Sequence, residues 1–306
     1  MSETAVDAVA LGTPVPKARG ARGWWKDPWR KPRILSAITW AYLAWSILPV
    51  LIAIAISFNA GRSNTDIQTL GLRWWINDPD NGSLFQDPDL RRAMVQTYSL
   101  SILTMLIAVP LGVAFAIGID RWRGRPARGA NFLMLFTFVM PEIIIGVALQ
   151  MVFQHLLKFV HLGTTAQVLG LVTYQISYPV IIVRARLLSI GKEYEEAAMD
   201  LGATPRQSIR GVLLPLLYPA IFASLAIVFA DTVDDFVTVR YLSGSGSSEP
   251  LSIKIYSVAR AAPTPAVNAA ATFMLVTTTL MIGLGYLGYR RLSRGQEGDV
   301  KAFAQV

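Results

Sequence analysis

The sequence predicts an all-α integral membrane protein whose helices cross the bilayer six times. The 306 residues have a mean hydropathy of +0.44 and only 16% of them are charged, whereas soluble domains average about 25% charged residues. A helix needs roughly 20 apolar residues to cross a bilayer core, and apolar runs of about this length recur along the chain. The expected transmembrane helices lie at residues 34–58, 93–119, 131–155, 165–187, 212–235 and 268–289.

The fourth expected span is less apolar than the others. Polar residues and a proline interrupt it, namely Thr173, Tyr174, Gln175, Ser177 and Pro179. Such interruptions are typical of a helix that packs inside a bundle rather than against lipid.

The distribution of lysine and arginine predicts which ends of the helices face the cytoplasm. If the N-terminus is cytoplasmic, 20 of the 28 basic residues fall on inside segments and 8 on outside segments, in agreement with the positive-inside rule. Both termini are therefore expected in the cytoplasm of a multi-pass protein of the inner membrane. Residues 1–33 then form a basic cytoplasmic tail, expected to be disordered, residues 34–290 the six-helix domain, and residues 291–306 a C-terminal cytoplasmic tail. The net charge of +8 does not indicate a nucleic-acid partner. Basic residues of membrane proteins collect on cytoplasmic segments, where they face anionic membrane lipid.

The residue content excludes several kinds of chemistry. The chain has no cysteine, which excludes disulfides, thiol catalysis and thiolate metal sites. The only Gly-Lys pair, Gly191–Lys192, lacks the other residues of an ATP-binding P-loop. No catalytic constellation and no metal site are recognisable, so the chain is not expected to be an enzyme or to bind a cofactor itself.

One charged segment, Glu193 to Pro215, lies between the fourth and fifth spans, on the expected cytoplasmic side. Three glutamates open a first short helix, where they complement the helix dipole, and Gly202 follows as its C-terminal residue. A second helix begins with a capping box of Thr204 and Gln207, with Pro205 at its first position. The spacing of Tyr194, Ala197, Ala198 and Leu201 gives the first helix a narrow apolar face. This pattern fits a docking helix or an ordinary cytoplasmic loop.

The segment resembles the EAA loop of the permease subunits of binding-protein-dependent ABC importers. The motif positions are Glu196, Ala197, Ala198, Gly202, Leu214 and Pro215, and Val212 stands where isoleucine is usual. The resemblance implies the type I importer permease fold, with residues 192–215 as a coupling loop between helices four and five that docks on an ATPase subunit. It also implies the partners: a second homologous permease, two ATP-binding cassette ATPases that bind the ATP, and an extracytoplasmic solute-binding protein.

Further stretches resemble the polyamine (spermidine/putrescine), PotC-like branch of this family. They are "RWWIN", "MPEIIIGVAL", "DDFV" and "PLSIKIYSVARAAPTPAVNAAAT", and the similarity spans about residues 35–290. The resemblance implies ATP-driven polyamine import. An importer of another small solute, such as ferric iron or an organic ion, and a transporter that works without an ATPase remain alternatives.

Four carboxylates at membrane depth are candidates for the substrate path. Glu142 follows Pro141 near the middle of the third expected span, where an ionised side chain costs roughly 2.5–3.5 kcal/mol. It either faces a solute path or pairs with a group on a neighbouring helix.

The other three candidates are Asp231, Asp234 and Asp235, whose spacing places them on one face of the fifth span near its outer end. A row of acids there would concentrate cations. An acidic cluster in solvent, or ion pairs with a partner permease or with Arg240, are the alternatives. Phe236, Tyr241 and Tyr256 offer aromatic faces for cations nearby.

Overall fold

The computed structural model describes the backbone of residues 33–64, 66–121, 124–244, 248–261 and 264–303. These residues form helices, with one isolated β-bridge between Asn59 and Leu70. The chain divides into two units, Met1–Leu51 and Ile52–Val306. The expected tail at 1–33 lies outside the described residues except for Arg33. Of the expected C-terminal tail, residues 291–303 continue the last helix and 304–306 lie outside the described part.

The first unit consists, in its described part, of most of helix α2, Arg33–Ser57. The helix is largely apolar, and none of its most apolar window is buried. A largely apolar helix of 25 residues is long enough to cross a bilayer core.

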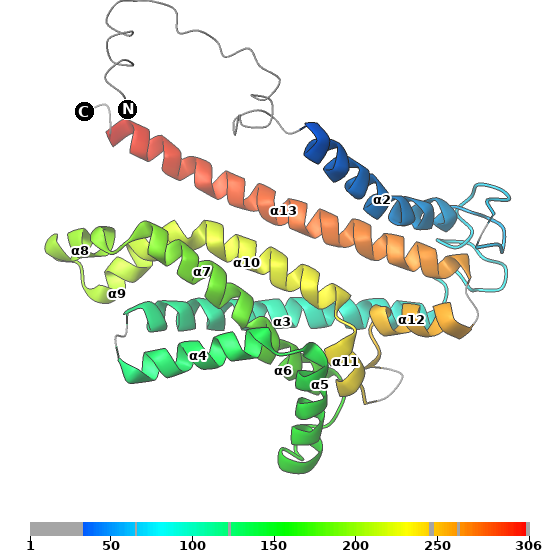
Figure 1. Ribbon diagram of the computed structural model, residues 1–306, viewed down its shortest axis with the longest axis horizontal. Coiled ribbons are helices and arrows are strands. Elements are labelled where there is room, and N and C mark those ends of the chain that lie inside the picture. The colour runs from blue at the N-terminus through cyan, green and yellow to red at the C-terminus, as the bar shows by residue number, and fades with distance from the viewer. Residues whose placement is uncertain (1–32, 65, 122–123, 245–247, 262–263, 304–306) are drawn as a thin grey trace, which may run out of the picture. The chain divides into compact units, whose positions relative to one another are not determined.

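The second unit holds the remaining helices (Figure 1). They are α3 (Pro88–Arg121), α4 (Arg125–Val139), α5 (Glu142–Met151), η2 (Val152–Leu156), α6 (Thr164–Gln175), α7 (Ser177–Ile190), α8 (Glu193–Asp200), α9 (Pro205–Ser208), η3 (Ile209–Leu213), α10 (Leu214–Asp234), α11 (Val237–Leu242), α12 (Leu251–Ala261) and α13 (Pro265–Phe303).

Among the residues that the structure describes, five helical segments are long and apolar enough to cross a membrane, and a bent pair of helices makes a sixth candidate. The five are Ile34–Ser57, Pro88–Arg121, Thr164–Ile190, Pro205–Asp234 and Pro265–Leu287. Thr164–Ile190 is the most buried of them, with 56% of its window inside the protein. The polar interruptions of the fourth span therefore mark an interior helix, as expected.

The third span is not the continuous helix that the sequence suggested over 131–155. It consists of α4 and α5, which meet at an angle of 107°. Met140 has a ψ of 138° and Pro141 a ψ of 131°, because a proline disfavours the helical conformation of the residue before it. Glu142 is therefore the first residue of α5 and not a mid-helix residue.

The centre of the second unit is an apolar core shared by α3, α7 and α10, which pack on one another along their lengths. Val113, Val183 and Leu217 are buried members of this core. Gly112 of α3 permits the closest approach, because a Cβ there would lie 2.5 Å from Cγ of Pro179 and 3.1 Å from the backbone oxygen of Ile176. The helix interruption at Ile176, between α6 and α7, thus rests directly on α3.

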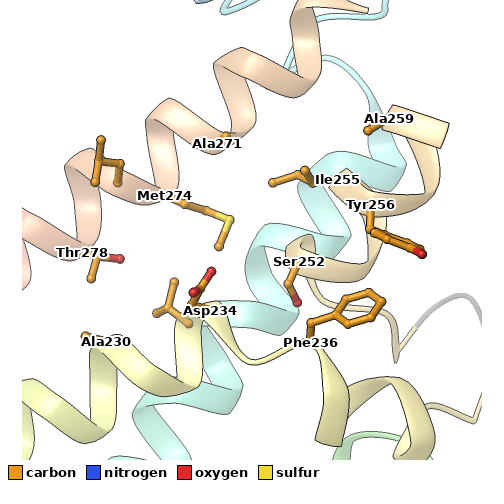
Figure 2. Close-up of a pocket in the computed structure, with 12 residues that line it drawn as sticks. Ala230, Asp234, Phe236, Ser252, Ile255, Tyr256, Ala259, Ala271, Met274 and Thr278 are labelled. Carbon is orange, nitrogen blue, oxygen red and sulfur yellow. The ribbon is translucent and has the colours of Figure 1, made fainter. Parts of the chain in front are cut away.

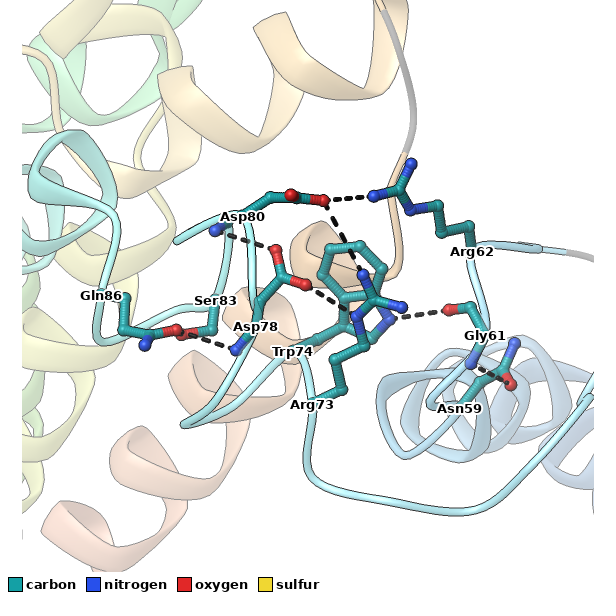
Figure 3. A network of polar contacts seen from close by, with 10 residues as sticks. Asn59, Gly61, Arg62, Arg73, Trp74, Asp78, Asp80, Ser83 and Gln86 are labelled. Carbon is teal, nitrogen blue, oxygen red and sulfur yellow. Dashed lines mark hydrogen bonds and ion pairs between the residues drawn. The ribbon is translucent and has the colours of Figure 1, made fainter.

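A network of polar contacts holds the segment between α2 and α3 (Figure 3). Arg73 donates from Nε to Asp78 Oδ1 at 2.7 Å, and the indole of Trp74 donates to the Gly61 carbonyl oxygen at 2.8 Å. Burial by itself raises the pKa of Asp78, but hydrogen bonds from Arg73 and the Gly82 backbone and the charges of Arg73 and Arg62 hold that pKa below its usual range. This segment is therefore a folded element.

The buried side chain of Gln167 in α6 forms hydrogen bonds with both ends of the segment that connects α11 to α12. Its amide nitrogen donates to Ser243 Oγ and to the Ser248 carbonyl oxygen, both at 2.9 Å, and its amide oxygen accepts from Gln96 at 2.7 Å. These bonds tie α11 and its following loop to α6 and α3, and so position the residues at the end of α10.

Candidate functional site: a helical docking unit and a group of membrane carboxylates

The segment between α7 and α10 folds as the two short helices that the sequence predicts. The capping box is present: Thr204 N–H donates to Gln207 Oε1 at 2.8 Å and Gln207 N–H donates to Thr204 Oγ1 at 3.4 Å. Gly202 has a φ of +90°, and Ala203 N–H donates to the Ala198 carbonyl oxygen at 3.0 Å. These bonds close α8 with a left-handed C-terminal residue. Hence the chain turns sharply between α8 and α9.

Most of the residues that resemble the EAA motif lie on α8 and at the start of α10. Glu196 and Ala197 are exposed, Ala198 is half-buried, and Leu214 and Pro215 open α10 after the π-helical turn η3. The chain therefore passes from α9 through η3 into α10 without leaving a helical conformation.

The apolar face of α8 is uncovered in the part of the chain that the structure describes. Leu201 is 91% exposed and Tyr194 is 58% exposed. Exposed apolar side chains such as that of Leu201 are typical of surfaces that bind a partner protein. Figure 1 shows α8 and α9 at the end of the second unit that is farther from α11 and α12.

Glu142 begins α5 at the broken span. A carboxylate in the first turn of a helix is favoured by the helix dipole, and the break at Pro141 is what brings it to that position. Glu142 is half-buried, and α5 packs against α6 and α11.

The three aspartates at the end of α10 have different surroundings: Asp231 and Asp234 lie in the helix, whereas Asp235 follows its end and departs from the face that the sequence predicts for all three. Asp231 accepts a hydrogen bond at 2.7 Å from the amide of buried Gln175 in α6. Asp235 is buried and accepts from the Val239 N–H at 3.1 Å, at the start of α11. The difference arises because α10 ends at Asp234 and the chain becomes extended at Asp235, where ψ is 124°.

Asp234 lines a pocket of about 660 Å³ formed by α10, α12, α13 and Phe236. Figure 2 shows its carboxylate directed toward Met274 of α13, with Ser252 and Tyr256 of α12 on the other side. The rest of the pocket is largely apolar. A single carboxylate in such a lining is suited to an organic cation with an aliphatic body.

Within the described residues, no lysine or arginine forms an ion pair with any of the four carboxylates. Arg240, the nearest basic residue in the sequence, pairs with Glu249 at 3.2 Å instead. The carboxylates are therefore not neutralised by a described basic side chain within 4.0 Å.

The aromatic residues near the carboxylates have distinct neighbours. Phe236 and Tyr256 lie with ring centroids 4.8 Å apart, and the Arg260 guanidinium covers the Tyr256 ring at 4.6 Å. Tyr241 packs against Gly146 of α5. Cation–π contact with a basic group is thus already made at Tyr256.

The sequence analysis treated Tyr174 and Gln175 only as interruptions of a span and did not single out Tyr178. In the structure Tyr174 and Tyr178 pack edge-to-face with centroids 6.0 Å apart, and Gln175 bonds Asp231. The polar residues in the fourth span indicated that this helix has polar partners, but the sequence did not reveal that Gln175 bonds Asp231 of α10. The described residues contain no group of three or more histidine, aspartate or glutamate side chains arranged to hold a metal ion.

Comparison with known proteins gives relatives over most of the chain. The permease protein PotC of the Escherichia coli K12 spermidine/putrescine transport system is 29% identical over 261 residues, which covers 85% of this chain and 96% of PotC. The permease protein PotI of the putrescine transport system of the same strain is 27% identical over 281 residues, covering 90% and 95%.

Solved structures share the fold. A bacterial ABC transporter involved in the import of the acidic polysaccharide alginate aligns with a TM-score of 0.66 at 19% identity, over 88% of this chain and 98% of that chain. The MetNI methionine ABC transporter aligns with a TM-score of 0.52 at 19% identity, over 67% and 93%. The fold is therefore that of a type I ABC importer permease.

The family described as binding-protein-dependent transport system inner membrane component matches residues 108–296. The match includes α8, α9, Glu142 and the three aspartates, that is, both parts of the candidate site. The chain is a multi-pass inner-membrane protein and belongs to this family of ABC importer permeases.

Proposed function

We propose that the chain is the membrane subunit of a polyamine importer driven by ATP hydrolysis in separate ATPase subunits. The relatives named for spermidine and putrescine transport support this substrate class. The observation that carries the proposal is the set of four carboxylates without an ion-pair partner among the described residues, namely Glu142, Asp231, Asp234 and Asp235. Polyamines carry several ammonium groups separated by short aliphatic chains, so a series of carboxylates in a partly apolar lining matches them.

The proposed path binds its solute weakly at several points. Asp234 opens to the pocket of α10, α12 and α13, while Asp231 accepts from Gln175 of α6 and Glu142 begins α5. Conduction requires binding that is favourable enough for entry and weak enough for exit. Carboxylates distributed over two sides of α10 fulfil this condition better than one tight site.

Energy enters the proposed transporter through α8 and α9. Glu196, Ala197, Ala198 and Gly202 would contact the ATPase, and Leu214 and Pro215 would pass its motion into α10. The exposed apolar face with Leu201 supports this role. The chain would bind no cofactor itself, because ATP binds to the partner. The assembly would contain a second homologous permease, two ATPases and a solute-binding protein, with both termini of this chain in the cytoplasm.

Uptake of labelled spermidine and putrescine by the complete complex tests the substrate class. Glu142→Gln and Asp234→Asn are expected to lower uptake about tenfold, since each tenfold step corresponds to 1.4 kcal/mol of lost binding. Asp80→Asn is the matched control, because Asp80 is an exposed carboxylate outside the bundle. Unchanged uptake in both path variants, or competition by organic anions rather than by polyamines, would contradict the proposal.

Co-purification with the ATPase tests the coupling role. Gly202→Asp and Glu196→Lys are expected to reduce the amount of ATPase retained, whereas the wild-type chain retains it. Full retention by both variants would count against docking at α8. Polyamine transport by the chain without any ATPase would instead favour a secondary transporter.

A further inference from the structure

A largely buried cluster of three charged residues joins α8 to the end of α3. Arg121, the last residue of α3, forms ion pairs with Asp120 and with Glu195 of α8. Its guanidinium holds both carboxylate oxygens of Glu195: Nη2 pairs with Oε1, and Nε donates to Oε2 at 3.2 Å. The side chains of Arg121, Asp120 and Glu195 are only 22%, 14% and 12% exposed. A two-pronged arginine–carboxylate contact of this kind fixes orientation as well as distance.

Glu195 is bound a second time, through its backbone. The hydroxyl of buried Ser208 in α9 donates to the Glu195 carbonyl oxygen at 3.3 Å. The side chain of Glu195 therefore reaches α3 while its backbone reaches α9. This one residue ties both short helices to a transmembrane helix that is distant in the sequence.

The two neighbouring glutamates of α8 point to different surroundings. Glu195 is 9% exposed, whereas Glu196 is exposed. The resemblance to the EAA motif concerns Glu196, and it assigns nothing to Glu195, Arg121 or Asp120. The buried carboxylate of Glu195 can therefore have a role different from that of Glu196.

Movement of α8 has two routes into the bundle. The covalent route runs through η3 into α10 and through Gly191 into α7. The other route runs through Arg121 into α3, which packs along both α7 and α10. Without the second route, the link between α8 and α3 would consist of the packing of α3 on α7 and α10.

We propose that Arg121 is a positioning residue that makes α3 move together with the ATPase-docking helix, so that ATP hydrolysis is coupled to opening of the solute path. The inference rests on the proposed function, because it takes α8 as the ATPase contact. Arg121 acts through Glu195 and touches neither the solute nor ATP. Loss of the contact leaves the ATPase bound and active but weakens its effect on transport.

The test uses the complete complex in proteoliposomes with its solute-binding protein. Solute uptake and ATP hydrolysis are measured together for Arg121→Gln, Glu195→Gln, the double variant and Arg121→Lys. Each single neutral variant is expected to lower the uptake per ATP hydrolysed by about tenfold, within the usual range of coupling between sites. ATPase retention stays at the wild-type level. Arg128→Gln, which alters an exposed arginine of α4 at the same end of the bundle, leaves the ratio unchanged.

The double variant decides whether the two residues act as a pair. If they do, it is no worse than the single variants, because interacting residues are not additive. Arg121→Lys retains the charge but not the two-pronged geometry, and so gives an intermediate ratio. Should either single variant fail to assemble, the double variant and Arg121→Lys carry the test. Arg121→Lys keeps a cation beside both carboxylates, and the double variant removes both charges of the Arg121–Glu195 pair, so that only Asp120 loses its arginine partner.

An unchanged uptake-to-hydrolysis ratio in the single variants, or additive losses in the double variant, would overturn the inference. Failure of the wild-type chain to retain an ATPase would instead overturn the proposed function. The two failures are therefore distinguishable by the co-purification measured on the same samples.

Discussion

At the scale of single residues, the direction in which a carboxylate points decides what it does. Asp231, Asp234 and Asp235 lie within five positions of one another, yet one accepts from a glutamine, one lines a pocket and one caps a helix. The same holds for Glu195 and Glu196 on α8. Adjacent acids on a helix diverge by about 100°, so neighbours in the sequence meet different elements.

The buried carboxylate of Asp78 gives a prediction about pH. Its folded-state pKa lies below the usual value, so its pairing stabilises the protein above the unfolded-state pKa of about 4. That stability is lost as the pH falls through the folded-state pKa. Asp78→Asn is expected to lower the free energy of unfolding by about 1 kcal/mol at neutral pH and to have a smaller effect at about pH 3.

Thermal unfolding of the detergent-purified protein at both pH values measures this difference. Asp80→Asn serves as the control, because Asp80 and Arg62 are 65% and 69% exposed and exposed ion pairs contribute little. An Asp78→Asn effect that grew as the pH fell would contradict the assigned pairing.

At the scale of elements, prolines and glycines decide where the transmembrane helices break and touch. Pro141 ends α4 and turns the chain by 107° into α5. Pro179 follows the interruption at Ile176 and lies against Gly112 of α3. The polar residues Glu142 and Gln175 stand next to these two interruptions.

The contact at Gly112 predicts an overpacking effect. Gly112→Ala adds a methyl group that meets the ring of Pro179 and the Ile176 carbonyl oxygen, and such overpacking typically costs about 1–3 kcal/mol. Gly118→Ala in the same helix is the control, since a Cβ there has nothing within 4 Å. The melting temperature is expected to fall for the first variant and to stay level or rise for the second. Equal melting temperatures would contradict the close packing of α3 on α7.

The end of α8 allows a test of backbone conformation without a steric effect. Gly202 has a φ of +90° and open space around an added Cβ, so Gly202→Ala suffers only the left-handed strain of about 1–2 kcal/mol. ATPase retention is expected to fall with Gly202→Ala and less with Gly202→Asn, because asparagine tolerates this conformation. Gly211→Ala, which also meets open space, should retain the ATPase fully. Similar losses in all three variants would refute the conformational explanation.

At the scale of the whole molecule, the sequence was sufficient for the fold class, for most spans and for the capped helices of α8 and α9. Apolar run length and capping signals are local, so Thr204, Gln207 and Gly202 could be assigned without knowledge of their neighbours. The break at Pro141 was missed because an apolar run does not reveal whether a proline bends a helix or ends it. The partners of Glu195 and Asp231 are 74 and 56 residues away in the sequence, and no periodicity encodes such a contact.

The orientation of the chain in the membrane is the remaining prediction at this scale, and the composition makes it testable. The chain contains no cysteine, so a single introduced cysteine is the only target for a membrane-impermeant maleimide. Leu201 of the α8–α9 turn and Leu70 of the segment between α2 and α3 are 91% and 78% exposed. If both termini are cytoplasmic, as the basic residues predict, Leu70→Cys is labelled in cells whose outer membrane is permeable. Leu201→Cys is labelled only in inverted inner-membrane vesicles. The reverse pattern would place α8 and α9 away from any cytoplasmic ATPase, and would therefore refute the orientation together with the coupling mechanism that depends on it.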